Sequence, residues 1–189
     1  MIDADETLET LALRAVTLRQ REALLPRVLA LAEAVARAHA LGLVHAELRP
    51  EGVRVGAFGV VLDWGCAREL GGLYDDRPWP ELRRGELARD VAFMAPEQVT
   101  GGRIDARVDV YAIAAVAYRV LAGEPPYAHE AAVTRRHALM AGPPVPLARR
   151  VPGLGRVTAL IDRAMAWSPH ERPQDAGVLV YALREVGVG

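Results

Sequence analysis

The chain has 189 residues, of which 51% are hydrophobic and 25% are charged, and its formal net charge is -1. This length and composition allow a substantial buried core and favour a single domain, whereas the balanced charge argues against a polybasic surface for nucleic acid or membrane. No apolar run approaches the ~20 residues that span a bilayer, and the acidic start MIDADETLET is unlike a secretory signal, so we expect a cytoplasmic protein.

The basic residues and the cysteine restrict the available chemistry. All 23 basic residues are arginine, asparagine is absent, and Cys66 is the only cysteine. No lysine is therefore available to meet a phosphate group as a compact point charge, and an internal disulfide is impossible. We expect Cys66 to be a small buried side chain.

The N-terminal part of the chain predicts two helices. Residues 1–9 form a short, acidic, polar lead-in to a helix over roughly 6–20. From Glu22 to Leu41 apolar residues recur at helical spacing, with Pro26 suited to the first turn and Gly42 to the C-terminal cap. His39, on this second helix, is expected to be a packed or capping residue.

The stretch from 43 to 65, LVHAELRPEGVRVGAFGVVLDWG, contains a compact polar loop between apolar runs. His45, Glu47 and Arg49 lie in this loop, and residues 53–55 and 59–62 predict a small hairpin that supports it. Asp63 follows the hairpin in a second polar turn. We therefore expect its carboxylate to approach the loop.

The remaining chain predicts a long connection followed by helices. Residues 66–94 are irregular and charged, with no Ser or Thr between Asp63 and Thr100 and one hydroxyl, that of Tyr74. Residues 105–123 are apolar on every face, which indicates a helix buried all round. Residues 128–153 predict a short helix over roughly 130–141 and then a proline-bearing extended loop, and two more helices are expected at about 155–166 and 174–186.

Five short motifs in this order resemble those of the protein kinase family. They are H-x-x-L-x-P at 45–50, D-W-G at 63–65, A-P-E at 95–97, D-V-Y at 109–111 and R-P at 172–173. The resemblance is to the C-terminal lobe of a bacterial Hanks-type serine/threonine kinase. It implies a mainly α fold with one small β-hairpin and no N-terminal β-lobe, as a single domain over 1–189 with a hinge-like start at 1–9 and an activation-segment-like stretch at 63–97.

The same resemblance places several replaced residues at functional positions. Glu47 stands where the family has its catalytic Asp, Ala46 where it has the neighbouring Arg, and Gly52 where it has a metal-binding Asn. Arg49 takes the place of a lysine directed at phosphate. Asp63 keeps the position of a magnesium ligand. The residue that forms the floor under the adenine ring is Arg54, and an unpaired charge buried there is costly, which argues against ordinary ATP binding.

Other residues retain structural roles in the resemblance. His45 and Trp64 belong to the loop and the metal-binding turn, and Asp109 is expected to receive backbone N–H groups from the loop. Glu97 and Arg172 are predicted to form a buried ion pair. Arg49 and Asp90 either pair and hold the segment closed or are two solvated surface charges.

Three functions remain open on this evidence. The first is a catalytically impaired, pseudokinase-like domain that needs no cofactor and binds or regulates another protein through the surface facing the absent N-lobe. The second is an active serine/threonine kinase that transfers the ATP γ-phosphoryl group, with Glu47 as base, Asp63 for Mg²⁺ and Arg49 toward the phosphate, given an N-lobe from elsewhere. The third is a nonfunctional gene fragment.

Overall fold

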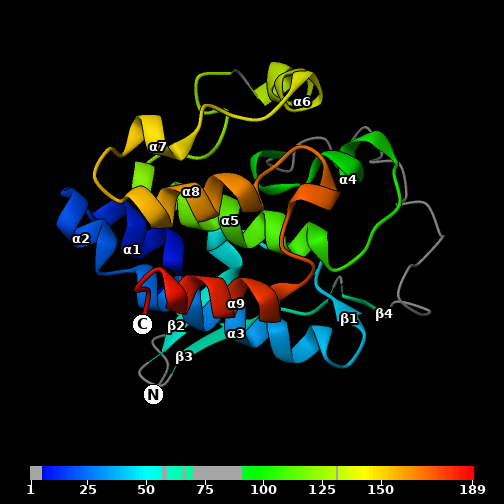
Figure 1. Ribbon diagram of the computed structural model, residues 1–189, viewed down its shortest axis with the longest axis horizontal. Coiled ribbons are helices and arrows are strands. Elements are labelled where there is room, and N and C mark those ends of the chain that lie inside the picture. The colour runs from blue at the N-terminus through cyan, green and yellow to red at the C-terminus, as the bar shows by residue number, and fades with distance from the viewer. Residues whose placement is uncertain (1–5, 57–58, 66, 70–90, 131) are drawn as a thin grey trace.

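The computed structural model describes residues 6–56, 59–65, 67–69, 91–130 and 132–189 (Figure 1). The α-helices are α1 (Leu8–Arg14), α2 (Leu18–Glu22), α3 (Leu25–His39), α4 (Pro96–Thr100), α5 (Arg107–Ala122), α6 (Ala132–Ala141), α7 (Leu147–Arg150), α8 (Gly155–Ala164) and α9 (Ala176–Glu185). The 3₁₀ turns within the described residues are η1 (Pro50–Gly52), η3 (Val91–Phe93) and η4 (Pro169–Glu171). The strands are β1 (Leu43–Val44), β2 (Val53–Gly56), β3 (Gly59–Leu62) and β4 (Arg68–Glu69). The mainly helical fold class is confirmed.

Helix α5 forms the centre of the core. Every residue from Val108 to Leu121 is buried, so the helix has no solvent face and is covered on all sides. Figure 1 shows it between α8 and the pair α3 and α9, which all pack against it. Gly123 ends the helix with a positive φ of 80°, and its N–H donates to the carbonyl of Arg119. The predicted buried helix over 105–123 is confirmed.

Helices α3 and α9 pack side by side in antiparallel directions. The N-terminus of α9 meets the C-terminus of α3, where the N–H of Ala176 donates to Nδ1 of His39 at 3.1 Å. Farther along α9, Arg184 pairs with Glu33 at 2.7 Å. Pro26 lies in the first turn of α3, as predicted, and this pair of helices fixes the orientation of the polar loop that follows α3.

Strands β2 and β3 form the predicted antiparallel hairpin, which is confirmed. Val53 and Val55 face inward and are buried. Arg54 lies directly opposite Val61 in the register, and because side chains alternate across a strand, both lie on the other, exposed face. A second small sheet, which the sequence did not indicate, pairs β1 with β4.

The predicted helix over 6–20 is wrong, because the chain forms two shorter helices there. Each begins at a threonine: Thr7 caps α1, and Thr17 caps α2 through its side-chain bond to the N–H of Gln20. The side chain of Gln20 accepts in return the N–H groups of Val16 and Thr17. These bonds satisfy the free donors of a new helix start, so the chain breaks between α1 and α2.

The predicted extended loop after α6 also needs correction, because it contains the short helix α7. Asp162, on α8, accepts the N–H groups of Leu147 at 2.6 Å and Ala148 at 3.2 Å. A cap supplied from 15 residues away stabilises a helix that local periodicity does not reveal. Throughout the described residues, no helix combines the length and the hydrophobicity needed to cross a bilayer.

Two tyrosines on α5 and a third just after this helix make the stability sensitive to alkali. Burial raises the pKa of Tyr111 well above its ordinary value, and the neighbouring Tyr127 raises it further. Burial also raises the pKa of Tyr118, and it raises the pKa of Tyr127 to about 12. Because the folded state holds these protons more tightly than the unfolded state, their contribution is complete below pH ~10 and is lost as pH rises toward about 12.

We predict that the free energy of unfolding stays level from about pH 8 to about pH 10 and then falls steeply. Urea denaturation at a series of pH values measures this, since the chain has no lysine to titrate in the same range. The Tyr127→Phe variant should show a shallower fall. An equal slope in this variant would contradict the assignment to Tyr127.

Candidate functional site

The polar loop after β1 is anchored on the carboxylate of Asp109. This side chain is 0% exposed, and its two oxygens accept the backbone N–H groups of His45 and Ala46, each at 2.7 Å. The contact predicted between Asp109 and the loop is therefore present. A buried carboxylate needs such donors, because desolvation without them is costly.

His39 adds a third donor to Asp109 and ties the loop to α9. Its Nε2 lies 3.0 Å from Oδ2 of Asp109, and its Nδ1 accepts the N–H of Ala176. The neutral tautomer with the proton on Nε2 satisfies both contacts. His39 is thus a buried connector between α3, α5 and α9, in keeping with the packed or capping role expected for it.

Ala46 has an unusual backbone conformation, with φ at 66°. A residue with a Cβ adopts this left-handed region at a cost of roughly 1–2 kcal/mol, so surrounding bonds must enforce it. Its N–H is held by Asp109, and its carbonyl accepts Nε2 of Gln98 at 2.8 Å. Sequence reasoning missed Gln98; the available signal was a polar residue next to Glu97, for which a buried ion pair was predicted.

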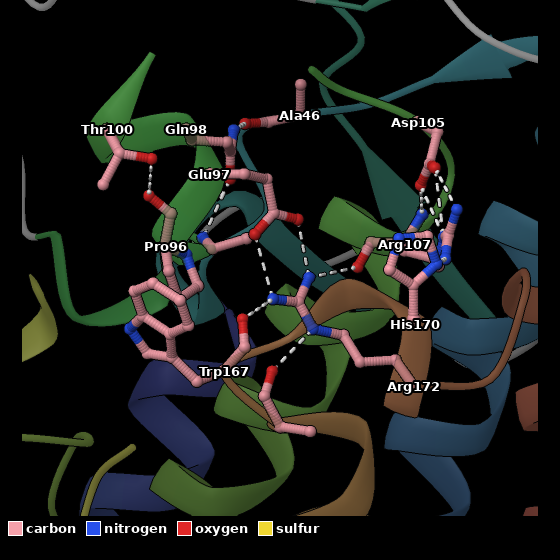
Figure 2. Close-up of polar contacts among 12 residues, drawn as sticks. Ala46, Pro96, Glu97, Gln98, Thr100, Asp105, Arg107, Trp167, His170 and Arg172 are labelled. Carbon is pink, nitrogen blue, oxygen red and sulfur yellow. Dashed lines mark hydrogen bonds and ion pairs between the residues drawn. The ribbon is translucent and has the colours of Figure 1, made fainter. Parts of the chain in front are cut away.

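The ion pair predicted between Glu97 and Arg172 is present and fully buried on the arginine side (Figure 2). Its two bonds are 2.6 and 2.9 Å long, and the Arg172 side chain is 0% exposed. The remaining guanidinium donors reach the backbone carbonyls of Arg107, Ala166 and Trp167. All five N–H donors of Arg172 are therefore used, and α4 is anchored to the turn between α8 and α9.

The predicted catalytic residues line one small hollow of about 100 Å³. Its walls are His45, Glu47, Leu48, Arg49, Gly52, Asp63 and Gly65. The structure thus brings Glu47, Arg49 and Asp63 together, as the sequence predicts. The described walls enclose much less than the roughly 300–1,000 Å³ typical of small-molecule sites.

The turn that carries Asp63 lies against the polar loop. Asp63 is exposed, and its Oδ1 accepts the N–H of Gly65 at 3.0 Å, so one carboxylate oxygen already serves the local turn. The ring of Trp64 lies 4.8 Å from that of His45, at an interplanar angle of 53°. The two residues expected to be structural are therefore in contact with each other.

The position of Arg54 differs from the buried site that would penalise its charge. Arg54 is exposed on the outer face of the hairpin and is not among the residues that line the hollow. Its guanidinium is solvent-exposed here, and the cost of burying this charge under an adenine ring stays a prediction. Asp90, the proposed partner of the exposed Arg49, lies outside the described residues, as do Cys66 and Tyr74.

The described residues offer a divalent cation few protein ligands. They contain no cluster of three or more His, Cys, Asp or Glu side chains suited to an ion. Glu47 and Asp63 both line the hollow, and magnesium is often held by one or two carboxylates together with substrate phosphates. Glu47 and Asp63 therefore fit one magnesium ion, but Gly52 supplies no side chain for the second ion that the kinase resemblance implies.

Comparison with known families identifies the fold. The family model described as protein kinase domain matches residues 3–179. This chain belongs to the protein kinase family. The loop at His45, the turn at Asp63 and the ion pair of Glu97 are thus parts of a kinase-family domain.

The similar curated proteins are bacterial kinases. The chain is 30% identical over 141 residues to the serine/threonine-protein kinase PknB of Mycobacterium tuberculosis, a match that covers 73% of this chain and 22% of that protein. It is 31% identical to Pkn1 and 32% identical to pkn2 of Myxococcus xanthus, over 80% and 84% of this chain. These matches cover 22% and 20% of the two proteins, so the kinase-family chain spans about a fifth of each relative.

We predict that breaking the Glu97–Arg172 pair by removing one partner lowers the free energy of unfolding by about 3–5 kcal/mol. In Arg172→Leu the carboxylate of Glu97 loses both charged donors, and in Glu97→Leu a buried guanidinium is left without its counter-ion. The double variant should lose less than the sum of the two losses, because it leaves no unpaired charge. Urea denaturation of all four proteins measures this, and additive losses would contradict a coupled pair.

We predict that Asp109→Asn destabilises the protein by about 1–3 kcal/mol, because the amide can accept only one of the two loop N–H groups and directs its own NH₂ at the other. Asp162→Asn is the matched control, since Asp162 also accepts two backbone N–H groups but lies far along the chain, on α8. Amide hydrogen exchange should accelerate at His45 and Ala46 in the first variant only. Equal protection of these two amides in both variants would argue against the anchor.

Proposed function

We propose that this chain is a catalytically impaired protein-kinase-like domain that acts by binding or regulating another protein. The observation that carries the proposal is a contrast between two sets of residues. Asp109 and Arg172, which position the loop and α4, are buried and fully bonded. At the positions that would hold and activate a nucleotide, the family's residues are replaced by others or a suitable side chain is missing.

Two replacements and the absence of lysine support impairment. Glu47 is one methylene longer than the aspartate of the family, and a misplacement of about 1 Å can cost on the order of 10²-fold in rate. Gly52 has no side chain to offer a metal. The chain also has no lysine to meet a phosphate as a compact charge.

The partner surface we propose is the outer face of the β2–β3 hairpin. Arg54 and Val61 are cross-strand neighbours on this face, and Val61 is 45% exposed. In the kinase resemblance this is the face directed at the nucleotide and the N-lobe. An arginine beside an exposed aliphatic side chain is suited to a protein surface that offers an acidic group next to an apolar one.

An active serine/threonine kinase is the second candidate, and one observation favours it. Glu47, Arg49 and Asp63 line the same hollow, so a carboxylate base, a cation and a metal ligand lie close together. Under this alternative an N-lobe from elsewhere would have to supply the remaining nucleotide contacts.

Titration with Mg-ATP in a thermal-shift assay distinguishes the two candidates. Under our proposal the melting temperature of the wild-type chain moves by less than about 1 °C. A nucleotide at 100 times its Kd would add about 2.7 kcal/mol, which is several degrees for a chain of this size. A saturable rise that Asp63→Ala abolishes would favour the active kinase.

The Gly52→Asn variant provides a matched gain-of-ligand control. A Cβ at Gly52 would meet only the Arg49 side chain, at 3.9 Å, which is an ordinary van der Waals contact, so the first side-chain atom of the new residue causes no clash. We predict that Gly52→Asn leaves the free energy of unfolding within about 0.5 kcal/mol of the wild type. Because its stability is unchanged, comparison of this variant with the wild type in the same Mg-ATP titration isolates the effect of adding one metal-ligating side chain.

A further inference from the structure

Gln98 joins two segments that are far apart in the sequence. It lies in α4, is 3% exposed, and its amide is bonded at both ends (Figure 2). Its Oε1 accepts the N–H of Ala95 at 2.9 Å, which caps the start of α4. Its Nε2 donates to the carbonyl of Ala46, 52 residues earlier, at 2.8 Å.

The two partners require one orientation of the Gln98 amide. The N–H of Ala95 is a donor and the carbonyl of Ala46 is an acceptor, so a flipped amide would oppose like groups at both ends. The bond to Ala46 is also buried, where an unmade hydrogen bond is costly. The amide therefore has a defined geometry and couples the cap of α4 to the loop.

Ala46 is held from two directions in its left-handed conformation. Asp109 in α5 accepts its N–H, and Gln98 in α4 donates to its carbonyl. Its methyl side chain has no polar atom, so its hydrogen bond to α4 is made through the backbone carbonyl. The neighbouring Glu97 is bonded twice by Arg172. This ion pair holds α4, and therefore Gln98, in a fixed position.

We propose that Gln98 is a positioning residue that transmits the anchoring of α4 to the polar loop and keeps Ala46 at positive φ. This coupling uses a neutral amide and two backbone groups, so it requires no phosphate or metal. The stretch before α4 has no Ser or Thr after Asp63, in keeping with a coupling that does not depend on a modified hydroxyl. The inference concerns the loop itself and holds for either candidate function.

Amide hydrogen exchange of the whole chain, without any ligand, tests the coupling. Gln98→Leu removes both bonds at similar volume, whereas Gln98→Glu keeps an acceptor for Ala95 and, when ionised, loses the donor to Ala46. We expect exchange at His45 and Ala46 to rise about tenfold or more in both variants. Amides in the turn around Arg172 should keep their protection.

The matched control is Val99→Ala, on the same helix. Val99 is buried and its side chain has no hydrogen-bonding atom, so this variant lowers the stability of α4 without removing the coupling. The loop amides should exchange no more than about twofold faster in it. The proposal is overturned if, at a matched melting temperature, the loop amides exchange no faster in the Gln98 variants than in Val99→Ala. If Gln98→Leu does not fold, Gln98→Glu decides alone by the same criterion.

A second measurement separates positioning from general packing. Glycine adopts positive φ without the penalty of a Cβ, so Ala46→Gly should make the loop less dependent on Gln98. In that background the effect of Gln98→Leu, or of Gln98→Glu if the first does not fold, should fall below about threefold. An effect of the same size in both backgrounds would show that Gln98 does not act through the conformation of Ala46.

Discussion

The structure depends first on the buried carboxylate of Asp109. It collects two N–H groups from the loop and the ring of His39, and His39 in turn receives the first N–H of α9. One side chain on the central helix thereby sets the relation of α3, α5, α9 and the loop. Because a buried carboxylate without donors is strongly disfavoured, these elements can only pack in an arrangement that brings the donors to it.

The second buried charge, Arg172, works in the same way near the same N-terminal end of α5. Arg172 meets Glu97 and three backbone carbonyls, and its guanidinium lies 5.0 Å from the centre of the Tyr111 ring. Buried ion pairs add little net stability compared with apolar packing, but breaking one is expensive. Their value here is that they fix one arrangement of α4 and the turn before α9. Glu47, Arg49 and Asp63 belong to neither buried charge cluster and instead line the hollow.

Sequence reasoning succeeded where a feature was periodic or belonged to an ordered set of motifs. The helices over 22–41 and 105–123 follow from apolar spacing, and the contacts of Asp109 and Glu97 follow from the kinase resemblance. It failed where helix boundaries are set by reciprocal caps or by caps distant in the sequence. Thr17 and Gln20 form a capping box that ends the first predicted helix early, and Asp162 caps α7 from 15 residues away. The positive φ of Ala46 could not be predicted from the sequence either, because this conformation is normally indicated by glycine and not by alanine.

The anchors hold the loop backbone at His45 and Ala46, while the side chains of Glu47 and Arg49 line the hollow. A side chain displayed by a preorganised backbone loses less entropy when it meets a ligand or a protein, so rigidity serves recognition as well as catalysis. Preservation of the loop geometry is therefore not an argument for phosphoryl transfer. The distinction between a binding domain and a kinase rests instead on the catalytic and metal-binding positions 47, 52 and 63. At these positions the chain provides two carboxylates and a glycine.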